Sequence, residues 1–132
     1  GKLAYIVEQF RWNKWIKVGE TEGIGTPEQN EYSFKISSHT GENQFRVKQI
    51  DYTGKPRYSK SAKYVSTAPE ITFSPIKVAK DIIFTGETMF EIYDSYGNIV
   101  KKGFADKVDV SNLKKGIYYL NYDNKTDKFV KK

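Results

Sequence analysis

Apolar and polar residues alternate along most of the chain with a period of two. In residues 3–9, 32–37 and 89–93, every second side chain is apolar or aromatic. Such alternation is typical of half-buried β-strands. Clusters of Gly, Pro, Asn, Asp and Ser separate the runs about every eight to twelve residues, a spacing typical of a β-sandwich. No segment keeps a helical period, so the pattern predicts an all-β chain with almost no helix.

The alternation predicts strands in both halves of the chain, with residues 20–30 as a loop rich in Gly, Pro and polar side chains. The strands predicted in the first half cover residues 3–9, 15–19, 32–37, 45–51 and 57–65. Those predicted in the second half cover residues 71–73, 81–84, 89–93, 99–102, 107–110, 117–122 and 128–131.

The segment around Pro69 divides the chain into two modules. Pro69 cannot donate a backbone hydrogen bond to a sheet and tends to stand between elements, and the strand pattern restarts after it. We therefore expect two tandem antiparallel β-sandwich modules, residues 1–66 and 71–132, joined by a linker at residues 67–70.

The charge and cysteine content narrow the function classes. The net charge is +6, and the lysines alternate with apolar residues, as in Lys14–Trp15–Ile16–Lys17. On a strand this places lysine on the solvent face, where it also protects sheet edges. A basic nucleic-acid surface is the weaker reading and predicts salt-dependent binding. The absence of Cys excludes disulfides, thiolate catalysis and Cys-based metal sites, and no run is long and apolar enough to span a bilayer.

Residues for catalysis are sparse. His39 is the single histidine and is expected to be an exposed residue of a polar turn. The sequence contains no nucleophile motif for which it could act as the base. Asp94, Asp106, Asp109 and Asp123 stand in or beside turns, where Asp commonly caps backbone amides. We predict no enzyme activity, no cofactor and no metal, although calcium at Asp94, Asp109 or Asp123 remains an alternative.

The segment Trp12–Asn13–Lys14–Trp15, with a tryptophan at each end, is the most distinctive local feature of the first module. Trp12 falls in the predicted turn at residues 11–13, and Trp15 begins the following strand. An exposed aromatic ring can stack on a sugar or on a partner side chain. The alternative is that both rings pack over the end of the sheet.

Residues 3–65 resemble the later part of a fibronectin type III-like domain found in exported bacterial proteins. The resemblance rests on the segments YIVEQ, WIKVG and EYSF, and on the following positions: Phe45, Arg46, Gln49, Asp51, Gly54, Lys55, Tyr58 and Ser59. A full domain of that kind has two more strands before residue 3. The first module is therefore expected to be incomplete, and to be completed by strands of a longer precursor or by a dimer partner.

Residues 71–132 resemble the C-terminal sorting domain of the type IX secretion system. The matching positions are Tyr93, Asp94, Gly97, Val100, Leu113, Gly116, Tyr118, Phe129, Val130 and Lys131. The resemblance implies a non-catalytic region of an exported protein that passes through the periplasm and is secreted or held at the cell surface. Secretion-system proteins at the outer membrane are the implied partners, and nucleic acid is not.

The resemblance points to two groups of site residues in the second module. The motif turns contain Asp94, Gly97, Leu113, Gly116 and Tyr118. The receptor contacts are expected on the last strand, where an edge offers amides and lysines; these are Lys128, Phe129, Val130, Lys131 and Lys132. Two alternatives stay open: the last strand is an ordinary lysine-protected edge, or the chain is a surface module that binds glycan or protein through Trp12 and Trp15.

Overall fold

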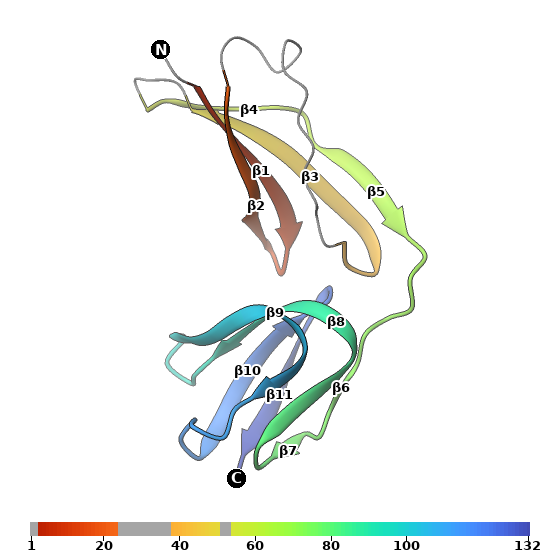
Figure 1. Ribbon diagram of the computed structural model, residues 1–132, viewed down its shortest axis with the longest axis vertical. Coiled ribbons are helices and arrows are strands. Elements are labelled where there is room, and N and C mark those ends of the chain that lie inside the picture. The colour runs from red at the N-terminus through yellow and green to blue at the C-terminus, as the bar shows by residue number, and fades with distance from the viewer. Residues whose placement is uncertain (1–2, 24–37, 51–53) are drawn as a thin grey trace. The chain divides into compact units, whose positions relative to one another are not determined.

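Every regular element in the described part of the chain is a β-strand (Figure 1). The computed structural model describes residues 3–23, 38–50 and 54–132. The first strands are β1 (Leu3–Arg11), β2 (Lys14–Gly23), β3 (Gly41–Ile50), β4 (Pro56–Tyr58) and β5 (Ala62–Ser66). The others are β6 (Phe73–Ser74), β7 (Lys77–Val78), β8 (Asp81–Tyr93), β9 (Ile99–Asp109), β10 (Gly116–Tyr122) and β11 (Lys125–Lys131). The prediction of an all-β chain is confirmed.

The chain divides into two compact units, each with its own sheet. Unit 1 comprises Gly1–Ser38 and Glu42–Ser66, and unit 2 comprises His39–Gly41 and Thr67–Lys132. Unit 2 thus takes in a short segment that the sequence places within the first module.

The sheet of unit 1 has the strand order β2-β1-β3-β4, with β5 also paired to β3. β1 pairs antiparallel with both β2 and β3. Tyr5 and Val7 are buried on one face of β1, as the alternation predicts. The turn between β1 and β2 is Trp12–Asn13, where both residues have positive φ. Two such residues in a row favour the tight hairpin turn whose twist matches the strands.

The buried face of β1 becomes polar towards this turn. Gln9 and Arg11 continue the face of Tyr5 and are also buried. Gln9 Nε2 donates a hydrogen bond to Asn43 Oδ1 on β3 at 3.1 Å, and Asn43 Nδ2 donates to the Tyr64 carbonyl on β5 at 3.5 Å. Because buried amides need partners, this chain of bonds ties three neighbouring strands together.

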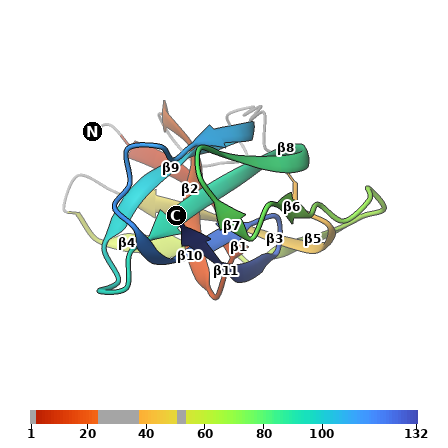
Figure 2. The ribbon, with the colours of Figure 1, turned by 90° about the horizontal axis from the view of Figure 1, so that it is seen from below.

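β8 is the central strand of unit 2. The strand order is β6-β8-β10-β11-β7, and β9 also pairs with β8. Most of these pairs are antiparallel, but β7 runs parallel to the end of β11, and Figure 2 shows it beside that end near the C-terminus. The N–H groups of Val130 and Lys132 donate to the carbonyls of Ile76 and Val78 at 2.8 and 2.9 Å. β7 therefore covers the end of the last strand.

The inward faces of the unit 2 strands form one apolar core. Phe84 stacks on Tyr122 with ring centroids 5.6 Å apart, and Tyr118 stacks on Phe129 at 5.4 Å. The members of this core are Val78, Ile82, Phe84, Phe90, Ile92, Val108, Val110, Tyr118, Leu120, Tyr122 and Phe129. β8 and β10 contribute most of these residues at alternate positions, as the two-residue period of a strand requires.

Asp123, in the tight turn between β10 and β11, is 1% exposed. Its carboxylate accepts the backbone N–H of Thr40 at 2.8 Å and that of Ile71 at 3.2 Å. Its own N–H donates to Thr88 Oγ1 at 2.8 Å, and the neighbouring Asn124 Nδ2 donates to the Thr40 carbonyl. A buried carboxylate needs such donors, so these bonds hold residues 39–41 in unit 2.

Several predicted element bounds were wrong. The predicted loop at residues 20–30 begins later, because β2 continues to Gly23 beside β1. The strand predicted at 57–65 is divided into β4 and β5. Two pairs of predicted strands are joined in β8 and β9, which stay paired across irregular register between Ile83 and Thr88. β7 was missed because two residues are too short to show alternation. The strand predicted at 32–37 lies outside the described residues.

The two faces of β10 provide a test of the core of unit 2. Leu120 is fully buried, whereas Ile117 is 53% exposed. We expect Leu120→Ala to lower the unfolding free energy of unit 2 by about 3 kcal/mol through lost burial and a residual cavity. Ile117→Ala is the matched control and should cost less than about 1 kcal/mol. Urea titration followed by the NMR signals of β10 and β11 measures both, and equal losses would contradict the assigned core.

Candidate functional site

The first motif turn closes the β8–β9 hairpin. Asp94 Oδ1 accepts the backbone N–H groups of Tyr96 and Asn98, each at 2.9 Å. Donation from the Asn98 N–H, followed by that from Tyr96, holds the pKa of the Asp94 carboxyl below its usual value. Gly97 has a φ of +85°, a conformation that Gly adopts without strain. The predicted role of Asp94 and Gly97 in turn formation therefore has a direct physical basis.

The second motif turn leads from β9 into β10. The Asp109 carboxylate accepts the N–H of Ser111 at 2.8 Å, and the Leu113 side chain packs against the core. The Tyr118 hydroxyl donates to the Lys114 carbonyl at 2.7 Å, which fixes the turn onto the buried ring of Tyr118. Leu113 and Tyr118 thus hold the turn through packing and a hydrogen bond.

The two motif turns meet at one hollow of unit 2. The hollow has a volume of about 360 Å³. The lining residues are Asp94, Ser95, Tyr96, Lys114, Lys115, Gly116, Ile117 and Tyr118. We call this site the motif-turn hollow. The motif residues were predicted from the sequence, but the contribution of Tyr96 and Ile117 was missed because no local pattern places two separate turns side by side.

The last strand presents only some of its predicted contact residues. Lys128, Val130 and Lys132 have exposed side chains. Phe129 is fully buried in the core, and Lys131 is 7% exposed, with its Nζ donating to the Lys132 carbonyl. The side chain of Phe129 is therefore a core element and cannot touch a receptor while unit 2 remains folded.

The outward face of β10 and β11 combines apolar and basic side chains. Ile117 pairs with Val130 across the two strands, and Tyr119 pairs with Lys128. The Lys128 ammonium lies 5.8 Å from the centre of the Tyr119 ring, within reach of a cation–π interaction. Because Ile117 also lines the motif-turn hollow, this face is continuous with the hollow.

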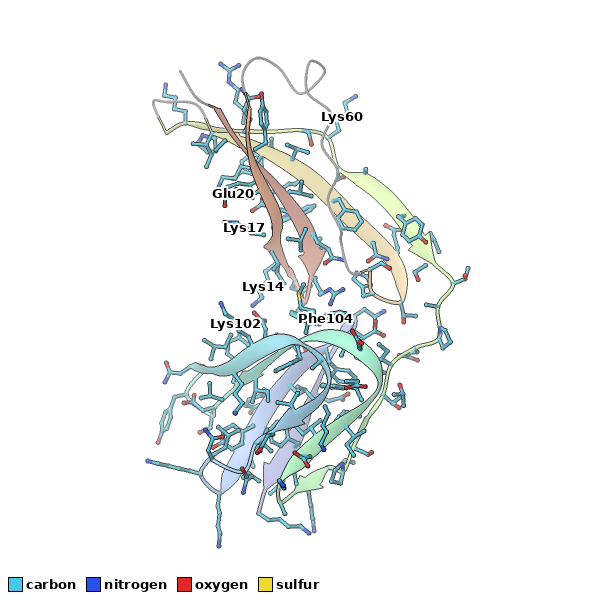
Figure 3. The ribbon with its side chains drawn as sticks, in the orientation of Figure 1. Lys14, Lys17, Glu20, Lys60, Lys102 and Phe104 are labelled. Atoms are coloured by element: carbon cyan, nitrogen blue, oxygen red, sulfur yellow. The ribbon has the colours of Figure 1, made fainter. Side chains whose placement is uncertain are left out.

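β9 adds further exposed lysine and apolar side chains to the surface of unit 2. Lys102 and Phe104, whose side chains are labelled in Figure 3, pair with Glu91 and Met89 of β8. Phe104 is 52% exposed. Mixed lysine and apolar positions of this kind are common on protected edge strands.

Trp15 of unit 1 takes part in a stack rather than standing free. The Arg46 guanidinium lies 4.2 Å from the Trp15 ring centre and 4.1 Å from that of Tyr58. Arg46 Nε also donates to Glu8 Oε1 at 2.7 Å, and Phe10 contacts Trp15 with ring centroids 5.3 Å apart. We call these five residues the arginine stack. The arrangement occupies a face of the Trp15 ring that a ligand would need.

Trp12 is likewise engaged. The Arg11 guanidinium lies 5.4 Å from the Trp12 ring centre. The indole N–H of Trp12 is buried and has no hydrogen-bond partner among the residues that the structure describes. Further along β2, away from the tryptophan rings, Lys17 and Glu20 form an ion pair, and Figure 3 labels both side chains. The contacts of Arg11 with Trp12 and of Arg46 with Trp15 favour the alternative in which both tryptophans pack on their own sheet.

The described residues include no group of three or more His, Asp or Glu side chains placed to hold a metal ion. The prediction of an exposed His39 is wrong: its side chain is buried, and its Nδ1 lies 2.7 Å from the Thr40 carbonyl. Asp94, Asp109 and Asp123 each accept backbone N–H groups. Within the same residues, no helix is long and apolar enough to cross a membrane.

The arginine stack predicts a stability difference between two arginines of unit 1. Arg46→Met keeps the aliphatic stem but removes the charge, so it should lower the unfolding free energy of unit 1 by about 1–2 kcal/mol. The exposed Arg57 is the matched control, and Arg57→Met should have little effect. Tryptophan fluorescence during urea unfolding reports on unit 1, since both tryptophans belong to it. Equal effects of the two variants would contradict the stack.

The Asp94 turn predicts a pH-dependent contribution to the stability of unit 2. The N–H groups of Asn98 and Tyr96 lower the pKa of the Asp94 carboxyl. The ionised carboxylate therefore stabilises unit 2 fully at pH values above its ordinary pKa of 3.8. This stabilisation is lost as the pH falls through the lowered pKa. Asp94→Ala should therefore lower the thermal midpoint at pH 7, and the gap to wild type should narrow below about pH 4. Asp106→Ala, at an exposed position on β9, is the control. A gap independent of pH would rule this account out.

Comparison with known proteins gives one family match and one structural likeness. No curated protein matches the chain. The solved "Structure of amphioxus IgVJ-C2 molecule" is 13% identical, with a TM-score of 0.25, and the alignment covers 96% of this chain and 86% of that chain. Residues 74–132, which run from the end of β6 through β11, match the family described as the secretion system C-terminal sorting domain.

Proposed function

We propose that residues 74–132 act as a sorting signal for the type IX secretion system, on an exported bacterial protein that is secreted or held at the cell surface. The observation that carries the proposal is the sorting-domain match over this range. It is supported by the position of the matched range, which contains all eleven buried residues of the unit 2 core. A module with a core of its own can keep its fold while a secretion protein binds its surface.

The last strand is the proposed contact for outer-membrane secretion proteins. Lys128, Val130 and Lys132 offer exposed side chains there. The N–H groups of Val130 and Lys132 already donate to the carbonyls of Ile76, just before β7, and of Val78 in β7, so we assign recognition to side chains and not to strand addition at this end. A receptor with acidic and apolar groups fits this composition.

A non-catalytic role is part of the same proposal. The described carboxylates of Asp94, Asp109 and Asp123 are bonded to backbone amides, which makes them unsuited to proton transfer. Unit 1 is proposed to be the fibronectin type III-like spacer that precedes the signal. Glycan or protein binding through Trp12 and Trp15 is the weaker candidate, because arginine side chains occupy their rings.

Export of a reporter tests the sorting role. The complete 132-residue chain is fused behind a periplasmic reporter enzyme and expressed in a bacterium that has a type IX secretion system. We expect reporter activity outside the cell, whereas a fusion to residues 1–66 alone should stay in the periplasm. Retention of the reporter with the complete chain would refute the proposal.

Point variants make the test independent of folding. Deleting residues 128–132 would remove the core residue Phe129 and so confuse misfolding with lost recognition. The double variant Lys128→Gln and Lys132→Gln removes two exposed charges and leaves the core intact. It should reduce export several-fold, while the double variant Lys101→Gln and Lys102→Gln on β9 should not. Equal export by the two double variants would contradict the assignment of the last strand as the contact for secretion proteins.

A further inference from the structure

The motif-turn hollow contains two lysines that the fold itself does not use. The turn needs Leu113 for packing and Tyr118 for the hydrogen bond to the Lys114 carbonyl. The side chains of Lys114 and Lys115 are exposed, and within the described residues neither forms an ion pair. Two unpaired ammonium groups beside a hollow favour an anionic ligand.

The other lining groups restrict the kind of anion. Tyr96 is 88% exposed and Ile117 is 53% exposed, so two large apolar surfaces stand beside the lysines. A ligand that carries both carboxylates and apolar side chains would use both features.

The state of Asp94 favours peptide over sugar. Its Oδ1 accepts two backbone N–H groups, and its Oδ2 accepts the Asn98 side-chain amide at 3.4 Å. Both oxygens of the lining carboxylate therefore already accept hydrogen bonds within its own turn. A sugar hydroxyl would compete with these turn bonds for the carboxylate, whereas the carboxylates and apolar side chains of an acidic peptide need only the cationic and apolar groups of the hollow.

We propose that the motif-turn hollow binds an extended acidic peptide segment of a partner protein, with its carboxylates on Lys114 and Lys115 and an apolar side chain on Tyr96 and Ile117. This names a class of partner for the sorting module and rests on the proposed function for its biological setting. Ile117 pairs with Val130, so the surface offered to this partner extends to the last strand.

Titration of the complete chain with a defined probe tests the proposal. The probe is a fluorescein-labelled hexapeptide of alternating Glu and Leu, and its counterpart of alternating Gln and Leu is the uncharged control. We expect binding of the acidic peptide that weakens as salt is raised, because exposed charges are screened. NMR shift changes should concentrate at residues 94–98 and 114–118, and the uncharged peptide should bind much more weakly.

Matched variants separate the hollow from general charge attraction. The double variant Lys114→Gln and Lys115→Gln should weaken binding about tenfold, while Lys101→Gln with Lys102→Gln removes the same charge from β9 and should leave it nearly unchanged. Tyr96→Ala should also weaken binding, whereas Tyr64→Ala, at an exposed tyrosine of unit 1, should not.

Three outcomes would overturn the proposal. They are the absence of peptide binding at millimolar concentration, equal loss in the two lysine double variants, and binding of a heparin-derived tetrasaccharide at the hollow in place of the peptide. The reporter assay is independent of these measurements. Export without peptide binding would therefore refute the peptide site in the hollow but not the sorting role. Peptide binding without export would refute the sorting role but not the peptide site.

Discussion

Unit 2 depends on the burial of alternate residues along β8. Ile82, Phe84, Phe90 and Ile92 are all buried on its inward face, and the strand pairs with β6, β9 and β10. Because neighbouring residues must point to opposite faces, a one-residue shift of register would expose this whole set. The positions of both motif turns follow from this constraint, since the turns begin where β8 and β9 end.

The surface of unit 2 is set by the same alternation. Residues that leave the core face of β10 and β11 form an outward row in which Ile117 lies opposite Val130 and Tyr119 lies opposite Lys128. Ile117 belongs both to this row and to the motif-turn hollow. The hollow and the exposed side of the last strand are thus parts of one surface, so a partner that binds one lies close to the other.

Unit 1 uses polar and cationic contacts where unit 2 uses apolar ones. On one face of its sheet, Arg46 lies between Trp15 and Tyr58 and pairs with Glu8. On the other face, Gln9 bonds to Asn43 beside the buried Tyr5. Guanidinium groups stack well on aromatic rings and bind carboxylates at the same time. The rings of Trp15 and Tyr58 therefore serve their own sheet, which a count of aromatic residues does not reveal.

The sequence by itself determined the all-β class and the residues of both motif turns. These features are local: side-chain alternation and the Asp–Gly turn chemistry are read within a few residues. Only the tertiary structure decided which turns share a hollow, that Phe129 is buried within the predicted contact strand, that β7 covers its end, and that Thr40 bonds to Asp123. Those contacts join residues far apart along the chain, and a local pattern carries no information about which distant segment supplies a partner.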